Sequence, residues 1–182
     1  MNNEIRASYT HEVIRVYQAY NKIIANEAIL KGTFGSNFEM DRMTWIKPSF
    51  LWMMYRCGWA TKENQEHVLA IDMSREGFDY IVKNSVSSVY NADLNISHEA
   101  WKEQIKESDI RCQWDPERDI YGNPLNYRSI QLGIRGDTLR KYVNEWIISI
   151  TDITGFVKDL KEKKDNGTDI NSLLPKEKKY IY

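Results

Sequence analysis

Alternating apolar and polar positions along the chain predict several β-strands. The alternation is clearest over residues 127–134, YRSIQLGI, where a central strand is expected. The other expected strands share β-branched or aromatic residues and lie at 12–20, 67–73, 86–90, 110–114 and 147–154.

Helices are expected between these strands, where apolar residues recur every three or four positions. Ser74, Ser97 and Asp137 each precede such a run, and short polar side chains are favoured as helix N-caps. An earlier helix is expected to end at Gly32, because glycine readily adopts the left-handed conformation that closes helices. Strands that alternate with helices predict a mixed α/β fold.

The length of the chain fits one domain. A chain of 182 residues can bury a sizeable core without disulfides or a structural metal. We therefore predict a single α/β domain over residues 1–165. Lysine, aspartate, asparagine and glycine dominate after it, so residues 166–182 are expected to form a charged, frayed tail.

The segment Arg42–Ala60, RMTWIKPSFLWMMYRCGWA, has the most unusual pattern in the chain. Pro48 suits the first turn of a helix. On a helical wheel Ser49 and Arg56 form one polar stripe on an otherwise apolar helix, which predicts that the helix is buried. A buried guanidinium needs an anion, so Arg56 is expected to meet either a carboxylate of the stretch 113–119 or an anionic group of a ligand.

Two residues ahead of this helix support a ligand site. Lys47 lies beside the expected helix N-terminus, where free amides and the helix dipole favour anions. Lys47 and Ser49 could therefore hold a phosphate. Trp45 could stack on a base, or it could fill the core.

Polar residues in the second half of the chain offer further candidates. The stretch Gln113–Asp119, QWDPERD, contains three carboxylates, which suit acid–base catalysis but are also common as solvated or capping groups in turns. Arg128 and Gln131, on the expected central strand, either line a cleft or meet a buried partner.

Composition and missing motifs narrow the function classes. The 25 basic and 26 acidic residues nearly balance, so a nucleic-acid binder would have to concentrate its basic residues on one face. The sequence contains no glycine-rich phosphate loop, no nucleophile elbow and no His or Cys residues at ligand spacing, so a metal-independent site is expected. Without an apolar leader or a membrane-length apolar run, a cytoplasmic protein with no membrane partner is expected.

Five segments together resemble a bacterial and fungal family described as domain of unknown function 4291. They are IRASY, RVYQAYN, RMTWIKPSFLWMMYRCGWATK, QWDPERD and YRSIQLGI. The resemblance extends from Ile5 to about Pro175 in the family's order. It implies the fold of that family but no particular activity.

The segment VYQAYNKIIANEAILKGTF is more remotely similar to the opening of ADP-ribosyltransferase-fold domains, which include RNA phosphate-transferring members. That resemblance implies split sheets flanked by helices and an NAD-binding cleft between two small sheets. It places Gln18 or Arg15 at the first-strand position and Gln131 at the late-strand position. The phosphate-holding arginines that it implies are Arg6, Arg56 and Arg128.

We therefore expect an ADP-ribosyltransferase-like protein that binds NAD, a related nucleotide or an RNA end, with group transfer as its chemistry if it is an enzyme. The alternatives are a non-catalytic module that binds RNA or protein, and a purely structural network of these polar residues. The candidate catalytic residues are Gln18, Gln131 and Arg56, and the candidate ligand-binding residues are Arg6, Tyr17, Trp45, Lys47, Ser49 and Arg128.

Overall fold

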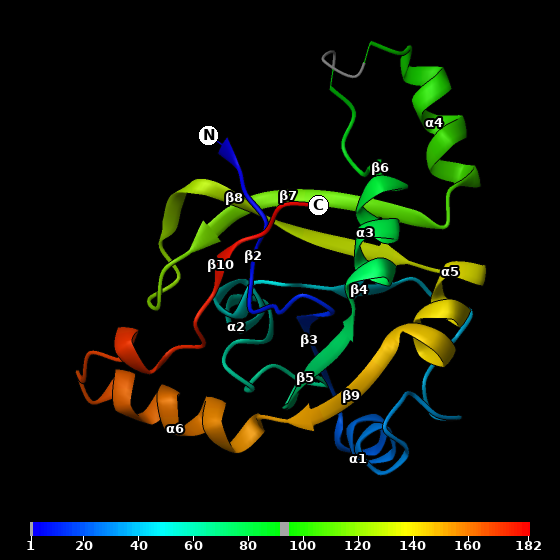
Figure 1. The fold of residues 1–182 in the computed structure, drawn as a ribbon. Coiled ribbons are helices and arrows are strands. Elements are labelled where there is room, and N and C mark those ends of the chain that lie inside the picture. Colours follow the sequence, from blue (N-terminus) through cyan, green and yellow to red (C-terminus); the bar gives the residue numbers. More distant parts are fainter. Residues whose placement is uncertain (1, 92–94) are drawn as a thin grey trace.

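Two main sheets with helices around them organise the chain in the computed structural model, which describes residues 2–91 and 95–182 (Figure 1). The elements in chain order are β1 (Asn2–Asn3), β2 (Arg6–Ala7), β3 (Val13–Tyr20), α1 (Lys22–Lys31), β4 (Thr44–Ile46), α2 (Phe50–Cys57), β5 (His67–Ser74), α3 (Arg75–Lys83), β6 (Val86–Ser87), α4 (His98–Glu107), β7 (Ile110–Arg118), β8 (Pro124–Ile134), α5 (Gly136–Lys141), a π-helical turn (Tyr142–Trp146), β9 (Ile147–Asp152), α6 (Thr154–Asp165), a 3-10 turn (Asn171–Leu173) and β10 (Lys178–Lys179). This is the mixed α/β domain that the sequence predicts.

The larger sheet is built around β8. Strand β7 pairs with it in antiparallel register along one edge, while β1 and β4 share its other edge. The short strand β6 adds to β7 in parallel. The prediction of a central strand at 127–134 is therefore confirmed, and the strand begins earlier, at Pro124.

The smaller sheet is antiparallel in the order β3-β5-β9. It joins the larger sheet at one point, where Tyr17 of β3 and Lys47, just after β4, exchange two backbone hydrogen bonds. The Tyr17 N–H donates over 2.7 Å and the Lys47 N–H over 3.3 Å. After this junction the chain continues into α2.

Apolar residues fill both faces of the smaller sheet. One cluster lies between the two sheets, with Ile14 and Ile71 packed in the same core as Leu132, and α3 closes it with Phe78. The second cluster lies on the other face of β3 and β5, under α2 and α6. The two helices of this layer contribute Met53, Met54, Val157 and Leu160.

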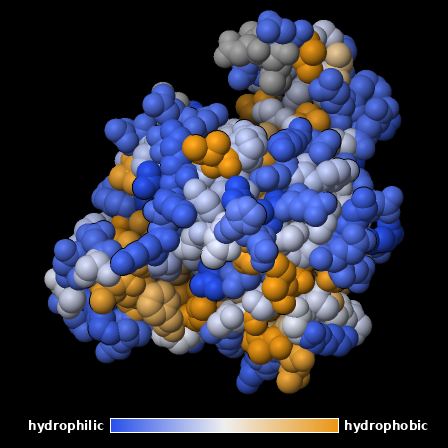
Figure 2. Space-filling view, viewed as in Figure 1, coloured by the Kyte–Doolittle hydropathy of each residue, from blue (hydrophilic) through white to orange (hydrophobic). Residues whose placement is uncertain are grey.

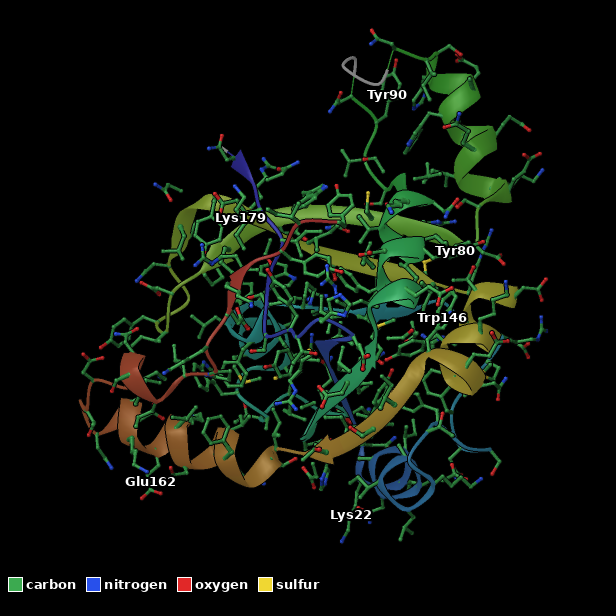
Figure 3. All side chains as sticks on the ribbon, viewed as in Figure 1. Lys22, Tyr80, Tyr90, Trp146, Glu162 and Lys179 are labelled. Carbon is green, nitrogen blue, oxygen red and sulfur yellow. The ribbon has the colours of Figure 1, made fainter. Side chains whose placement is uncertain are left out.

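A glycine in α3 makes room for an aromatic contact. A Cβ on Gly77 would lie 2.4 Å from the Trp146 ring, so this position accepts no larger side chain without displacing the tryptophan. The Trp146 ring also lies beside Tyr80, with ring centroids 5.5 Å apart (Figure 3). Helix α4 and Tyr90 lie apart from this packed body (Figure 3).

The caps show which local predictions succeed. Ser74 accepts a hydrogen bond from the Gly77 amide and Ser97 from the Ala100 amide, as expected of N-caps. Gly32 ends α1 with a φ of 70°. The prediction that Asp137 caps the next helix is wrong, because its own amide donates to the Asp109 carboxylate, 3.0 Å away.

The surface is mostly hydrophilic on the face drawn in Figure 2, with apolar side chains exposed over α1 and α6. The exposed apolar residues of these helices are Ile23 and Leu30 in α1 and Phe156 in α6. Within residues 2–91 and 95–182, no helix combines the length and apolar character needed to cross a membrane.

The C-terminal segment packs against the beginning of the chain, so the expectation of a frayed tail after residue 165 is wrong. Strand β10 pairs with β2 (Figure 1), and Tyr180 is 3% exposed within the main core. The Tyr180 hydroxyl donates to Asp79 over 2.5 Å and accepts from Arg75 over 3.0 Å. A few apolar residues among the lysines are enough to anchor the segment.

Glu177, in this same segment, binds the N-terminus of α2. Its carboxylate accepts a hydrogen bond from the Phe50 amide over 2.7 Å. Burial, reinforced by the negative charge of Glu117, raises the pKa of Glu177 to about 8. The fold therefore favours the protonated acid at this position.

The Glu177→Gln variant is expected to become more stable than the wild type as the pH rises. The pKa of Glu177 rises from 4.5 in the unfolded chain to about 8 in the folded protein. The stabilisation that protonated Glu177 contributes is therefore complete below the unfolded-state pKa and is lost as the pH rises through the folded-state pKa. Glutamine keeps an acceptor for the Phe50 amide and cannot ionise. Melting temperatures of both proteins from about pH 5 to about pH 9 should diverge with pH, and a constant difference would refute this account.

Candidate functional site

A cavity of about 560 Å³ opens beside the point where the two sheets join. Strands β3, β4, β7 and β8 and helix α2 all contribute to its wall. The lining residues are Gln18, Ala19, Tyr20, Arg42, Met43, Thr44, Trp45, Lys47, Met53, Arg56, Asn64, Gln65, Gln113 and Gln131. The predicted candidates Gln18, Trp45, Lys47, Arg56 and Gln131 therefore meet in one place.

Arg56 is exposed, so the prediction that it is buried is wrong. Helix α2 packs through Phe50, Trp52, Met53, Met54 and Cys57, and this leaves Tyr55 and Arg56 to solvent. Arg56 has no carboxylate partner among the described residues, so the internal ion pair with the 113–119 stretch does not form. The Arg56 guanidinium therefore lies at the cavity without an ion-pair partner among the described residues.

Lys47 differs from Arg56 because its side chain is buried, with 7% exposure. Its Nζ donates to the Trp45 carbonyl over 3.2 Å, and no carboxylate of the described chain pairs with it. Burial, together with the positive charge of Arg56, lowers the pKa of Lys47 to about 7. The amine therefore exists in both its neutral and its charged form near neutral pH.

Trp45 lies over a glycine of the central strand. It pairs with Gly133, where an added Cβ would come within 3.0 Å of the indole ring and 2.7 Å of the Met43 sulfur. Glycine at 133 thus lets the half-buried ring lie close against β8 at the edge of the cavity.

Asp115 holds two glutamines in a fixed orientation. Gln113 and Gln131 are cross-strand partners, and their Nε2 groups donate to the two Asp115 carboxylate oxygens over 3.0 and 2.9 Å. Because a carboxylate only accepts, each amide turns its NH₂ end toward Asp115. The carbonyl oxygens of both side chains remain as acceptors beside the cavity. Gln131 was a predicted candidate, whereas Gln113 and the role of Asp115 were not predicted.

Gln18 belongs to a buried hydrogen-bond network instead. Its Nε2 donates to the hydroxyls of Tyr20 and Thr44, each over 2.7 Å, and its Oε1 accepts from Tyr142 over 2.9 Å. Burial raises the pKa of Tyr142 well above its usual value, so this hydroxyl stays protonated and donates. Gln18 reaches the cavity wall with most of its hydrogen-bonding capacity already used.

At the start of α2, where a phosphate site was predicted, the backbone amides already donate to side chains of the protein. The Ser49 hydroxyl accepts from the Trp52 amide over 3.1 Å, and the Phe50 amide donates to Glu177. Ser49 is therefore a helix cap, away from the cavity lining. The ligand-binding role expected for Tyr17 is also wrong, because its ring is 1% exposed and packs edge-on against Phe50.

The arginines proposed to hold phosphate do not converge. Arg6 lies on β2 and pairs with Glu4 over 3.5 Å. Arg128 lines a different cavity, of about 430 Å³, with Trp114, whose carbonyl it contacts over 3.1 Å. The alternative first-strand residue Arg15 forms a two-bond ion pair with Asp72.

The acidic residues of the 113–119 stretch have separate structural roles. Strand β7 continues to Arg118, beyond the strand expected at 110–114, so most of this stretch is not a turn. Asp119 caps the following turn by accepting from the amides of Tyr121 and Asn123. Burial raises the pKa of Glu117, a residue of β7, the strand that packs against α2. No three His, Cys, Asp or Glu side chains gather as a metal site in the part of the chain that the structure describes.

One family model matches this chain. It is described as Domain of unknown function (DUF4291), and it aligns with residues 4–180. No curated protein matches the sequence.

Proposed function

The chain belongs to the DUF4291 family, and for this member we propose that the cavity beside the sheet junction binds a nucleotide, with NAD, ADP-ribose or an RNA end as candidate ligands. The observation that carries the proposal is the meeting of an aromatic ring, a free guanidinium and two oriented amide acceptors at one cavity. A volume of about 560 Å³ lies within the range of small-molecule sites.

Each part of a nucleotide has a partner in this arrangement. Arg56 binds a phosphate, because guanidinium and phosphate form strong charge-assisted hydrogen bonds. Lys47 adds positive charge when it is protonated. Trp45 stacks on the base, and Gln131 and Gln113 accept hydrogen bonds from ribose hydroxyls.

The arrangement of the sheets supports an ADP-ribosyltransferase-like fold. The two sheets are joined at Tyr17 and Lys47, and strands of both contribute to the cavity wall, as expected for split sheets with a ligand between them. In a transfer reaction from NAD, the nicotinamide would leave from the ribose, Arg56 would hold the diphosphate of the ADP-ribose unit, and Gln131 would orient the ribose. We assign Gln18 to the support of the cavity wall, because its amide is held by three internal partners.

An RNA-binding module is the second candidate. Gln113 lines both the first cavity and the cavity that contains Trp114 and Arg128. A strand of RNA could therefore place its end in the first cavity and a neighbouring nucleotide against Trp114. This arrangement needs no reaction.

A thermal-shift screen against NAD, ADP-ribose, AMP and short RNAs tests the proposal. A ligand at about 100 times its Kd should stabilise the fold by about 2.7 kcal/mol and raise the melting temperature. No shift with any of these ligands would refute the nucleotide site. Salt-sensitive binding of RNA without a response to nucleotides would favour the module.

The Asp115→Asn variant is expected to lose part of the discrimination between ribose and dideoxyribose. Asparagine offers one oxygen and one NH₂ group in place of two oxygens, so one of the two glutamines must turn its NH₂ group toward the ligand, and its acceptor for a hydroxyl is lost. The wild type should bind AMP roughly 10-fold more tightly than 2′,3′-dideoxy-AMP, by about 1–1.5 kcal/mol, and the variant should show a clearly smaller ratio. Calorimetric titration measures both ratios, and Asp119→Asn, in the turn, is the matched control. Unchanged discrimination in Asp115→Asn would contradict the proposed role.

A further inference from the structure

Lys47 has the position of a reactive amine. It is the buried cation on the cavity wall, with 7% exposure, and its backbone is fixed by two hydrogen bonds to Tyr17 at the sheet junction. Among the residues that the structure describes, the only hydrogen-bond partner of its Nζ is the neutral Trp45 carbonyl. A lysine that serves the fold through charge would be expected to have a carboxylate partner.

The surroundings of Nζ favour its neutral form. Burial removes water from the ammonium ion, and Arg56 places a second positive charge nearby, so the pKa of Lys47 falls to about 7. Cys57 and the negative charge of Asp115 oppose this effect only in part. Burial raises the pKa of the Cys57 thiol, so this group carries little charge at neutral pH. A neutral lysine amine is a nucleophile at physiological pH.

We propose that Lys47 forms an imine with the aldehyde or ketone of a phosphorylated sugar bound in this cavity. The phosphate binds the free guanidinium of Arg56, and the carbonyl carbon of the open-chain sugar reaches Nζ. The inference rests on the proposed function only for the anion site at Arg56. The substrate class is a phosphate-bearing carbonyl compound, such as an open-chain pentose phosphate.

The step begins when the Nζ lone pair attacks the carbonyl carbon and forms a C–N bond. The carbonyl π electrons move to oxygen, and a proton passes from nitrogen to that oxygen to give a carbinolamine. The hydroxyl group then takes a second proton and leaves as water, so a protonated imine remains. No oxidant or reductant takes part.

Reductive trapping with ribose 5-phosphate and sodium cyanoborohydride at about pH 7 tests the proposal, with peptide mapping by mass spectrometry. Cyanoborohydride converts the imine into a stable secondary amine. Lys47 should react at least ~10-fold faster than exposed Lys62, because an ordinary lysine is almost entirely protonated at this pH. The rate at Lys47 should rise with a midpoint near pH 7.

Lys47→Arg should abolish the preferred adduct, and Lys62→Arg should retain it. The pH profile of the wild type needs no variant, so it decides the question even if Lys47→Arg does not fold. Labelling spread over surface lysines, or a midpoint near pH 10, would overturn the proposal. If nucleotides still raise the melting temperature in that case, the nucleotide site stands and only the amine chemistry fails. Labelling of Lys47 without any nucleotide response would support the imine and refute the nucleotide site.

Discussion

Tyr180→Ala is expected to lower the free energy of unfolding by about 3–5 kcal/mol, the range for removal of a large buried aromatic side chain. The Tyr180 ring packs edge-on against Tyr9 and Phe78, with centroid distances of 4.8 and 5.4 Å. Its hydroxyl also links Asp79 and Arg75. The substitution therefore opens a cavity and leaves polar groups without their partner at the point where the two ends of the chain meet.

Urea denaturation measures this effect, and Tyr182→Ala provides a matched control. Tyr182 is 54% exposed and lies two residues further along, so the same change there should alter stability by less than ~0.5 kcal/mol. Equal stabilities for the two variants would mean that the C-terminal segment does not anchor the fold.

Arg56→Met is expected to weaken nucleotide binding roughly 10- to 100-fold, which corresponds to the loss of about 1.5–3 kcal/mol from a hydrogen bond to a charged group. Methionine keeps an unbranched side chain with good helix propensity, so α2 should remain intact. Because Arg56 is exposed and has no carboxylate partner among the described residues, the variant without ligand should melt as the wild type does.

Calorimetric titration with ADP-ribose separates the outcomes for Arg56. Arg128→Met is the control, since Arg128 lines the other cavity. Wild-type affinity in Arg56→Met would remove the anion site from this cavity. Unfolding of Arg56→Met would instead show that the guanidinium supports the fold.

Local patterns predicted the longer strands and several helix ends of this fold, whereas the short strands β1, β2, β4 and β10 were not predicted. The segment 127–134 lies in the central strand, although residues 129–134 are buried on both faces, and the Ser74 and Ser97 caps form as their side chains allow. The family resemblance agrees with the match over residues 4–180. The cap at Asp137 failed because Asp109, distant in sequence, reaches the same helix end.

The errors in the site have tertiary causes. A helical wheel shows that α2 is apolar on most sides, but it cannot show that the layer beneath leaves Arg56 uncovered. The α2 N-terminus looked free because its partner, Glu177, lies more than a hundred residues away. Lys47 was correctly placed near that helix, yet its burial depends on how the two sheets join.

The glutamine pair could have been found in part. Gln113 and Gln131 both lie on predicted strands, and antiparallel pairing of these strands brings them opposite each other. The register that aligns them was not available from either strand alone, since it depends on the turn between residues 118 and 124. The role of Asp115 follows only from that register.

A crystal structure of the protein with ADP-ribose tests the central claim most directly. We predict that the diphosphate lies within hydrogen-bonding distance of Arg56, that the adenine stacks on Trp45, and that a ribose hydroxyl donates to Gln131. A ligand bound instead between Trp114 and Arg128, with the cavity at the sheet junction empty at saturating concentration, would contradict the account.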